Sequence, residues 1–222
     1  MSGDRGLILS HSALGGPGLL GEWLHERGVP HEVHDLSSGP VPVLGAATFV
    51  ASLGSDESAT DTSIAWVRAE RALLREAIAA AVPVLGLCFG GQALALALGG
   101  EVGPARAPQV GWFELSGEGG EIPAGPWFHW HSEQFGVPPD AQALAYSGAG
   151  PAAFRHGPHL GLQFHPEVTP ALIAGWSRSE AALAALGIDA AVLRAQSERQ
   201  APRARTHAWM LFERWWGGLA GH

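Results

Sequence analysis

The sequence predicts an α/β fold in which helices flank a central, mostly parallel sheet. Short apolar runs bounded by Gly, Pro and Asp alternate with helical patterns in the first half of the chain, and the run Val82–Leu87 has the length and apolarity of a buried central strand. Short extended segments in the second half add a small antiparallel extension. With 222 residues, we expect a single domain over residues 1–222, with C-terminal helices at about 170–217 packing on it.

The first half contains four expected strands and three expected helices. The strands are short apolar or extended runs: Leu7–Leu9, His31–Asp35, Thr48–Leu53 and Val82–Leu87. The helices show amphipathic spacing: Leu19–Arg27 after a Gly-rich turn, a helix from the capping residue Asp61 to about Ile78, and Ala93–Leu98, which Gly99 ends.

The second half is expected to be extended first and helical later. The extended segments are Gly111–Leu115, Pro126–Trp130, Ala143–Ser147, Ala152–Arg155 and Leu160–Phe164, with a loop at 117–125. The helices are Ala171–Leu186, Ala190–Gln200 and Arg203–Trp216. Bulky residues at helical spacing on the last helix, including Trp209, Trp215 and Trp216, favour core packing over an exposed patch that docks another chain.

Composition excludes several kinds of site. All 13 basic residues are Arg and neither Lys nor Asn occurs, so a lysine-containing phosphate loop or a Schiff base is impossible. A single cysteine rules out an internal disulfide and a Cys-x-x-Cys zinc site, and we predict no cofactor. The net charge of -8 argues against nucleic-acid binding, and no apolar run is long enough to span a membrane. The first five residues are too short and acidic for a secretion signal, so we expect a cytoplasmic protein.

The sharpest motif is Gly86-Leu87-Cys88-Phe89-Gly90-Gly91-Gln92, between an expected strand and an expected helix. It matches a nucleophile elbow, a tight turn with cysteine where hydrolases more often carry serine. Side chains at 86 or 90 would collide with neighbouring backbone, and the following helix offers N–H groups and positive charge to a thiolate or an oxyanion. A free cysteine is often only a small buried residue, but the flanking glycines favour a nucleophile.

His165 is the candidate partner for proton transfer with this thiol. It ends the expected strand 160–164, and Pro166 confines its backbone to an extended conformation. Glu167 can turn its carboxylate toward the imidazole and fix its tautomer. His129 and His131 share a strand face and could bind zinc, but no further ligand at recognisable spacing accompanies them, so we predict no metal.

Two motifs in this order resemble those of the class I, or triad, glutamine amidotransferases: the run 86–92, and Leu162-Gln163-Phe164-His165-Pro166-Glu167-Val168. The stand-alone branch similar to the amidotransferase domain of GMP synthase is the nearest. Supporting matches are Pro83–Gly86, Leu98–Gly100, Gly111-Trp112 and the run 128–133. The resemblance covers residues 48 to 170 well and implies a three-layer, flavodoxin-like fold.

The resemblance also implies a reaction. Cys88 would attack the side-chain amide carbon of glutamine and form a γ-glutamyl thioester. His165 would pass the thiol proton to the departing ammonia and later activate water, while Glu167 orients it. Because 222 residues leave no room for a synthetase domain, the ammonia would pass to a separate synthetase partner.

Further site residues are implied by the same resemblance. The backbone N–H of Phe89 and one from the Gly54-Ser55 loop would hold the oxyanion. Gln92 and the segment Trp130-His131-Ser132 would contact the α-amino and carboxylate end of the substrate. This chain departs from the pattern at Ser55, where relatives carry a second glycine, and at 131–133, where they often read His-Gly-Asp. Both changes surround the amino-acid end of the substrate.

Two other functions remain open at this stage. A γ-glutamyl hydrolase or peptidase would use the same three residues on a γ-glutamyl amide larger than glutamine. A non-catalytic regulatory or binding module would retain only the fold, which the intact Cys88, His165 and Glu167 argue against. The sequence does not distinguish a synthetase partner from a homodimer.

Overall fold

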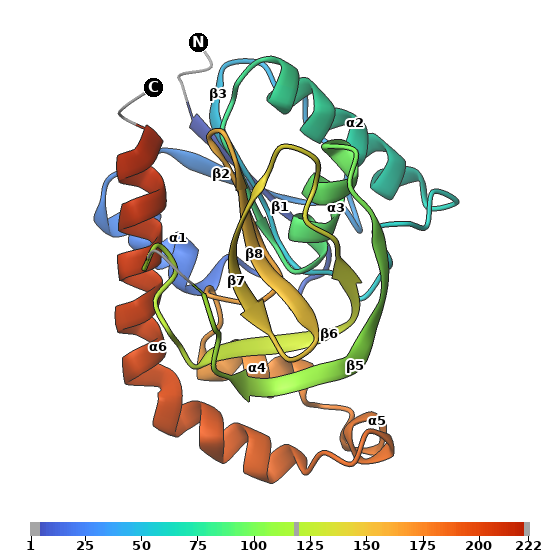
Figure 1. Cartoon of the computed structure of the whole chain (residues 1–222), viewed down its shortest axis with the longest axis vertical. Helices are drawn as coiled ribbons and strands as arrows, with labels where there is room; N and C mark the ends of the chain where they lie inside the picture. Colours follow the sequence, from blue (N-terminus) through green and yellow to red (C-terminus); the bar gives the residue numbers. More distant parts are fainter. Residues whose placement is uncertain (1–4, 118–119, 220–222) are drawn as a thin grey trace.

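The computed structural model describes residues 5–117 and 120–219 and shows a sheet of seven strands beside a separate pair (Figure 1). Residues 118 and 119 of the predicted 117–125 loop, and most of the N-terminal segment considered as a secretion signal, lie outside the described residues. The order in the large sheet is β2-β1-β3-β4-β9-β8-β7. Its strands are β1 Arg5–Ser10, β2 His31–Asp35, β3 Ala47–Ser52, β4 Val84–Leu87, β7 Gln142–Ser147, β8 Gly150–His156 and β9 His159–Leu162.

The five strands from β2 to β9 are parallel, whereas β8 and β7 continue the sheet in antiparallel fashion. Strand β9 pairs directly with β4, with Leu87 opposite Leu162. Segments far apart in the sequence therefore end side by side at the carboxyl edge of the sheet, where α/β folds place their sites.

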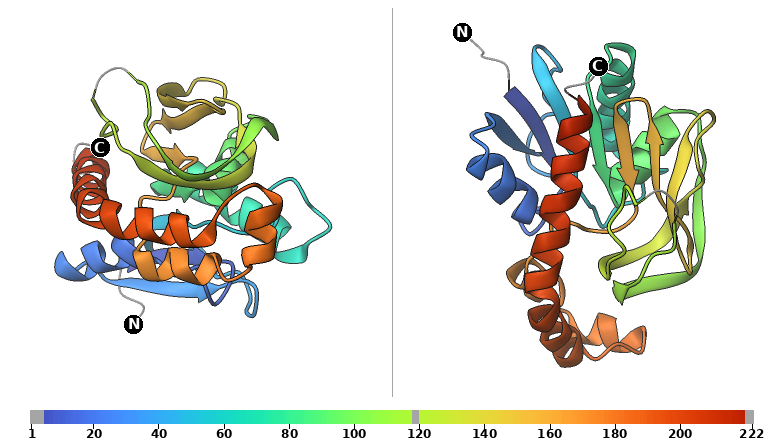
Figure 2. Two further views of the ribbon diagram at one scale, coloured as in Figure 1. Left: turned by 90° about the horizontal axis from the view of Figure 1, so that it is seen from below. Right: turned by 60° about the vertical axis from the view of Figure 1, so that its left-hand side comes forward.

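Helices cover both faces of the large sheet and make three layers (Figure 2). On one face, α1 (Gly18–Glu26) and α6 (Ala190–Leu219) form a core with the sheet that includes Trp23, Phe49 and Trp215. On the other face, α2 (Ala65–Ala79) and α3 (Phe89–Ala97) pack through residues such as Leu74 and Leu94. The predicted α/β class, with its mostly parallel sheet and small antiparallel extension, is confirmed.

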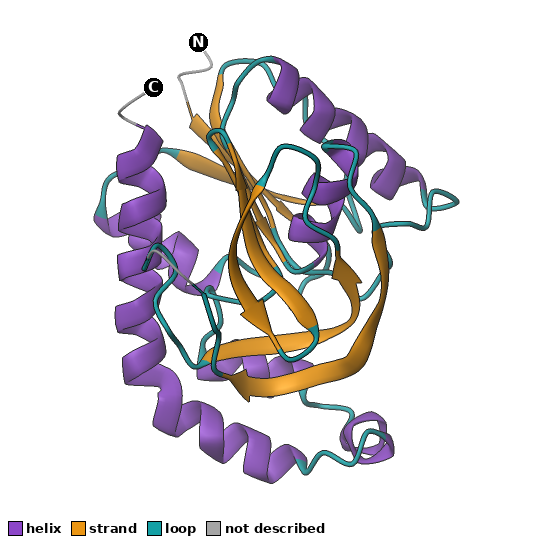
Figure 3. Ribbon diagram, in the orientation of Figure 1, coloured by secondary structure: helices purple, strands orange, loops and turns teal. Residues whose placement is uncertain are grey.

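Strands β5 (Val102–Phe113) and β6 (Trp127–Phe135) form an antiparallel ribbon apart from the large sheet (Figure 3). Both are much longer than the predicted segments. Pro104 and Pro108 lie within β5, which pairs with β6 on one side and has a register shift between Pro104 and Gln109. A strand with a free edge and a bulge tolerates residues that lack an N–H.

The C-terminal helices differ from prediction in their boundaries. The expected helix 171–186 is two short helices, α4 (Pro170–Trp176) and α5 (Glu180–Ala185), whereas the expected helices 190–200 and 203–216 are one, α6. Pro202 lies inside α6, which bends in its middle (Figure 1). Trp215, Leu211 and Phe212 are fully buried, so the last helix packs as expected, whereas Met210 and Val192 of the same helix are exposed.

The predicted first residues of two other helices were wrong. Helix α2 begins after Ile64 rather than Asp61, because the Asp61 carboxylate accepts hydrogen bonds from Ser63 in the preceding turn. Helix α3 begins at Phe89, directly after Cys88, so its first turn contains two glycines. Within the described ranges, no helix is both long and apolar enough to cross a bilayer.

Candidate active site

The turn between β4 and α3 presents Cys88 at the carboxyl edge of the sheet. The cysteine has φ 52° and ψ -106°, a left-handed backbone that side chains rarely adopt, and its N–H donates to the Leu162 carbonyl of β9 at 2.8 Å. The predicted need for glycine is confirmed: a Cβ on Gly86 would lie 2.4 Å from the Gly90 oxygen, and one on Gly90 would lie 2.0 Å from the Ser52 oxygen. Backbone atoms of β3, of β9 and of the turn after β4 thus meet around the Cys88 thiol.

His165 and Glu167 lie beside this thiol, as the sequence predicts. The Nδ1–H of His165 donates to Glu167 Oε1 at 2.7 Å, and both side chains are nearly inaccessible. The Nε2 edge is left for Cys88, whose charge and hydrogen bonding act on the imidazole. The His165 N–H binds the Phe128 carbonyl of β6 at 2.8 Å, and the ring packs on Trp176 at 5.0 Å. The imidazole therefore has little freedom to rotate.

Two opposed effects set the protonation of His165. Burial is the larger influence and by itself lowers the pKa of the imidazole. The Glu167 carboxylate, the Cys88 sulfur and the hydrogen bonds to both act together against it and raise the pKa of His165 to about 10. At neutral pH the imidazole therefore keeps its proton, which places a cation beside the Cys88 sulfur and a proton donor beside any leaving group.

Glu167 is held by a segment that the sequence did not connect with the site. The Leu19 N–H, in the first turn of α1, donates to the Glu167 carbonyl at 2.8 Å. Gly18 makes this approach possible, because it has φ +45° and a Cβ there would lie 2.1 Å from the same oxygen. The Gly-rich turn before α1 thus holds Glu167 in place, and Glu167 in turn orients His165.

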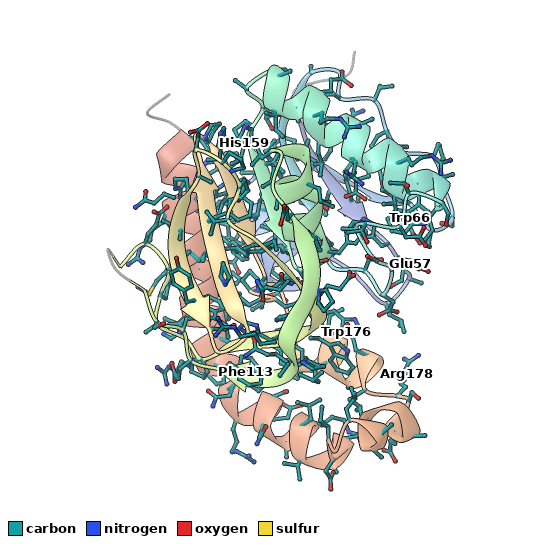
Figure 4. All side chains as sticks on the ribbon, turned by 45° about the vertical axis from the view of Figure 1, so that its right-hand side comes forward. Glu57, Trp66, Phe113, His159, Trp176 and Arg178 are labelled. Carbon is teal, nitrogen blue, oxygen red and sulfur yellow. The ribbon has the colours of Figure 1, made fainter. Side chains whose placement is uncertain are left out.

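Two cavities flank Cys88. One, of about 330 Å³, opens on the His165 side and is lined by Leu14, Gly54, Trp176 and Arg178 among others. The second, of about 450 Å³, opens on the other side and includes Gln92, Trp130, His131 and Ser132. Trp176 and Arg178 lie near the C-terminal helices, and Glu57 lies across from them (Figure 4). The thiol can therefore contact a molecule that extends in both directions.

The loop after β3 lines both cavities. Gly54 and Ser55 lie with Cys88 and His165 in the first cavity, and a Cβ on Gly54 would lie 2.7 Å from the His165 ring. Ser55 is not among the described non-glycine residues with positive φ, and its hydroxyl accepts the Glu57 N–H at 3.1 Å. The side chain at 55 therefore fits the loop without a strained backbone.

The chain is similar to known proteins in both sequence and fold. A model of the family "Glutamine amidotransferase class-I" matches residues 62–173. The chain belongs to the class I glutamine amidotransferase family. A glutamine amidotransferase from Methylobacillus flagellatus superimposes with a TM-score of 0.85 at 26% identity, over 97% of this chain and 95% of that one. A glutamine amidotransferase from Thermotoga maritima, at 24% identity and a TM-score of 0.86, shares the fold over 97% of this chain and 99% of its own.

Curated relatives of this amidotransferase chain match it over a smaller part of the two sequences. A subunit of the glutamine-hydrolyzing GMP synthase of Ignicoccus hospitalis is 35% identical over 96 residues, which is 39% of this chain and 51% of that protein. The glutamine-hydrolyzing GMP synthase of Alkalilimnicola ehrlichii is 30% identical over 172 residues, which is 68% of this chain and 31% of the relative. The chain thus spans about half or less of the length of these two relatives.

The residues that the amidotransferase resemblance assigns to the amino-acid end of the substrate lie together in the second cavity. Gln92 donates to the Glu133 carbonyl at 3.1 Å and to Gln163 Oε1 at 3.4 Å. The Trp130 carbonyl accepts the Cys88 thiol at 3.7 Å. Gln163 was missed: it is fully buried, and its amide reaches Cys88 Sγ at 3.8 Å. Its place between the apolar residues Leu162 and Phe164, two positions before His165, was the available signal.

His129 and His131 of β6 serve the hydrogen bonding of the amidotransferase core. The Glu133 carbonyl can only accept, so His131 Nδ1 donates to it at 2.9 Å and His131 Nε2 accepts from His129 Nδ1 at 3.2 Å. Burial is the main cause that lowers the pKa of His131 to about 4 and that of His129 well below its usual value. In the part of the chain that the structure describes, no group of three or more His, Cys, Asp or Glu side chains could hold a metal ion.

Proposed function

We propose that this chain hydrolyses the side-chain amide of glutamine through a thioester on Cys88 and releases ammonia. The observation that supports this most is the buried arrangement of Cys88, His165 and Glu167 between two cavities, one of which contains Gln92. The thiolate needs a nearby acid for the leaving group, and a protonated His165 supplies it.

The reaction runs in two halves. Cys88 Sγ bonds to the amide carbon, and the oxyanion lies against the N–H of Phe89, which has no acceptor within its own helix, and a second N–H from the Gly54-Ser55 loop. His165 protonates the amide nitrogen, and ammonia leaves. Water then attacks the thioester, His165 accepts its proton, and glutamate departs as Cys88 regains its thiolate. Glutamine and water thus give glutamate and ammonia.

The test is ammonia release from glutamine by the purified chain and by Cys88→Ala. We expect hydrolysis that the substitution abolishes, with thermal unfolding close to that of the unsubstituted protein. Activity retained in Cys88→Ala would refute the proposal. Failure of a glutamine-analogue electrophile to label Cys88, even with candidate partners added, would favour the non-catalytic module.

A partner synthetase follows from the same proposal. Relatives are named as GMP synthase or as one of its subunits, and the chain corresponds to only part of their length. We propose that the released ammonia passes to a separate chain that activates the acceptor, with a homodimer as the other assembly to test. Co-purification followed by size measurement distinguishes the two.

The first cavity favours a second candidate, hydrolysis of a larger γ-glutamyl amide. Its volume of about 330 Å³ far exceeds the space that ammonia needs, since a water molecule takes roughly 30 Å³. It lies on the His165 side, where the leaving group would depart, and the cation of Arg178 lines it beside the apolar surface of Trp176. An amino acid with a free carboxylate would suit this leaving-group cavity.

Comparing glutamine with γ-glutamyl dipeptides tests this candidate. If the chain acts on γ-glutamyl dipeptides, kcat/KM should be higher for the dipeptides than for glutamine. Arg178→Ala should lower kcat/KM about tenfold for the dipeptides, which is the size of one charge-assisted contact, and should leave kcat/KM for glutamine unchanged. Arg75→Ala, on the exposed face of α2, is the matched control. Equal effects of both substitutions, or preference for glutamine, would exclude a dipeptide substrate.

A further inference from the structure

A buried polar network lies directly behind the loop that lines the cavities. His11 follows β1, Glu70 lies in α2, and Ser52 ends β3; the side chains of His11 and Glu70 are completely inaccessible. His11 Nε2 lies 2.8 Å from Glu70 Oε2, and Ser52 Oγ donates to Glu70 Oε1 at 2.6 Å. Burying a carboxylate and an imidazole is costly unless both are paired, so the network needs its contacts to persist.

The outer end of this network is the backbone of the Gly54-Ser55 loop. His11 Nδ1 lies 3.0 Å from the Gly54 carbonyl oxygen. That oxygen can only accept, so Nδ1 carries the proton and donates. An ionised Glu70 can also only accept, so it favours a proton on Nε2 as well. Burial is the largest influence and lowers the pKa of His11, but Glu70 and the hydrogen bonds outweigh it and raise the pKa above its usual value.

The planar peptide bond transmits this contact across the loop. The bond between Gly54 and Ser55 is trans, so the Gly54 C=O and the Ser55 N–H point in opposite directions. With the carbonyl held by His11 inside the protein, the N–H is directed away from His11, toward the side on which Gly54 and Ser55 line the cavity with Cys88. A hydrogen bond donated to the carbonyl also polarises the peptide and makes its N–H a stronger donor.

His11 also contacts the other proposed oxyanion residue. Its ring lies 4.7 Å from the ring of Phe89, and the indole of Trp66 stacks on it at 4.9 Å with an angle of 25°. The Gly90 N–H donates to the Leu53 carbonyl at 3.1 Å, which joins the loop to the start of α3. One side chain thus contacts the Gly54 carbonyl and the Phe89 ring, which belong to the two segments whose backbone would bind the oxyanion.

We propose that His11, anchored by Glu70, is a positioning residue that directs the Ser55 N–H toward the tetrahedral intermediate. The inference rests on the proposed amide hydrolysis. The nucleophile Cys88 and its proton donor His165 do not themselves need the buried pair of His11 and Glu70. The inference gives this pair a role in the same site. Glu70 acts through His11, and Ser52 holds the carboxylate in place.

The test compares His11→Phe, which keeps an aromatic ring between Trp66 and Phe89 but cannot donate, with the unsubstituted protein. We expect kcat for glutamine to fall about 10- to 100-fold, below the loss typical of removing an oxyanion donor outright, with KM changed less than about threefold. Alkylation of Cys88 by iodoacetamide, which forms no oxyanion, should keep its rate. His11→Asn, which retains a donor near the Nδ1 position, should recover part of kcat.

A second measurement does not depend on turnover. Hydrogen exchange of the peptide covering residues 53–58 should be about tenfold faster in His11→Phe, the effect of one lost hydrogen bond. His159→Phe is the matched control, because His159 is also buried but begins β9 at the opposite end of the sheet from Trp176 (Figure 4). If His11→Phe does not fold, Glu70→Gln replaces it, with a smaller expected fall in kcat.

Several results would overturn the inference. Unchanged kcat, alkylation that falls in parallel with kcat, or unchanged exchange at 53–58 would each show that His11 serves packing alone. Absence of glutamine hydrolysis in the unsubstituted protein would instead contradict the proposed function, and the exchange measurement would still decide whether His11 holds the loop.

Discussion

Replacing Glu167 by Gln removes one charge from the centre of the site and changes little else in shape. The carboxylate lies 2.7 Å from His165 Nδ1, and both groups are buried. The rise in the pKa of His165 from 6.5 to about 10 corresponds to on the order of 5 kcal/mol in favour of the imidazolium. Glu167 is the first of the effects that raise it, so Glu167→Gln should leave burial opposed by Cys88 alone and lower the pKa of His165.

Two measurements follow from this change. Titration of the His165 ring by NMR should show a proton retained well above pH 7 in the unsubstituted protein and lost at a clearly lower pH in Glu167→Gln. Glutamine hydrolysis at pH 7.5 should fall on the order of 10³- to 10⁴-fold, as when the orienting carboxylate of a catalytic triad is replaced by an amide.

The same linkage fixes the sign of the pH dependence. The pKa of His165 is higher in the folded state than in the unfolded state, so the proton on His165 stabilises the folded state. This stabilisation is complete below pH 6.5 and disappears as the pH rises through about 10. The difference in free energy of unfolding between the unsubstituted protein and Glu167→Gln should therefore be larger at pH 6.5 than at pH 9.5. An imidazole that titrates near 6.5 in the unsubstituted protein, or a difference that grows with pH, would refute the reasoning.

Three further predictions concern stability, measured by denaturant unfolding. Gly90→Ala should cost about 3 kcal/mol or more, because its Cβ would lie 2.0 Å from a backbone oxygen of β3, whereas Gly16→Ala, with nothing within 4 Å, should change stability by less than about 0.5 kcal/mol. Trp215→Ala should cost about 3 to 5 kcal/mol because the indole is fully buried, and Met210→Ala, which is 41% exposed, is its control. Thr169→Ala should cost about 1 kcal/mol through loss of the N-terminal cap of α4, and Thr169→Ser should retain most of it; equal losses would contradict the capping role.

The order of elements and the candidate site could be predicted because they depend on local patterns. Apolar runs and amphipathic spacing are properties of a few neighbouring residues, and the glycines around Cys88 record close backbone contacts that the structure shows. His165 and Glu167 are two residues apart, so their contact is also local. Assembly of these groups next to Cys88 needed only the rule that parallel strands end at one edge.

Other features depend on contacts between distant segments and left no comparable pattern. His11 and Glu70 are 59 positions apart, and each alone reads as an ordinary polar residue on its element. The length of β5 depends on its pairing with β6, which overrides the prolines. Helix α6 continues through Pro202 because its two halves pack on different neighbours, α4 and α1, and a bent helix satisfies both contacts.

The pairing of β4 with β9 has a consequence for folding. After Cys88 the chain forms α3, the separate β5-β6 ribbon and the β7-β8 hairpin, and only then does β9 pair with β4 and join that hairpin to the parallel strands. The thiol and its proton donor therefore meet through contacts of high sequence separation, which form late because the intervening loop must close first. During synthesis, Cys88 emerges long before His165, so the proposed amide hydrolysis requires that the return strand β9 has docked. Appearance of activity during refolding should consequently report completion of the whole sheet rather than formation of the nucleophile turn.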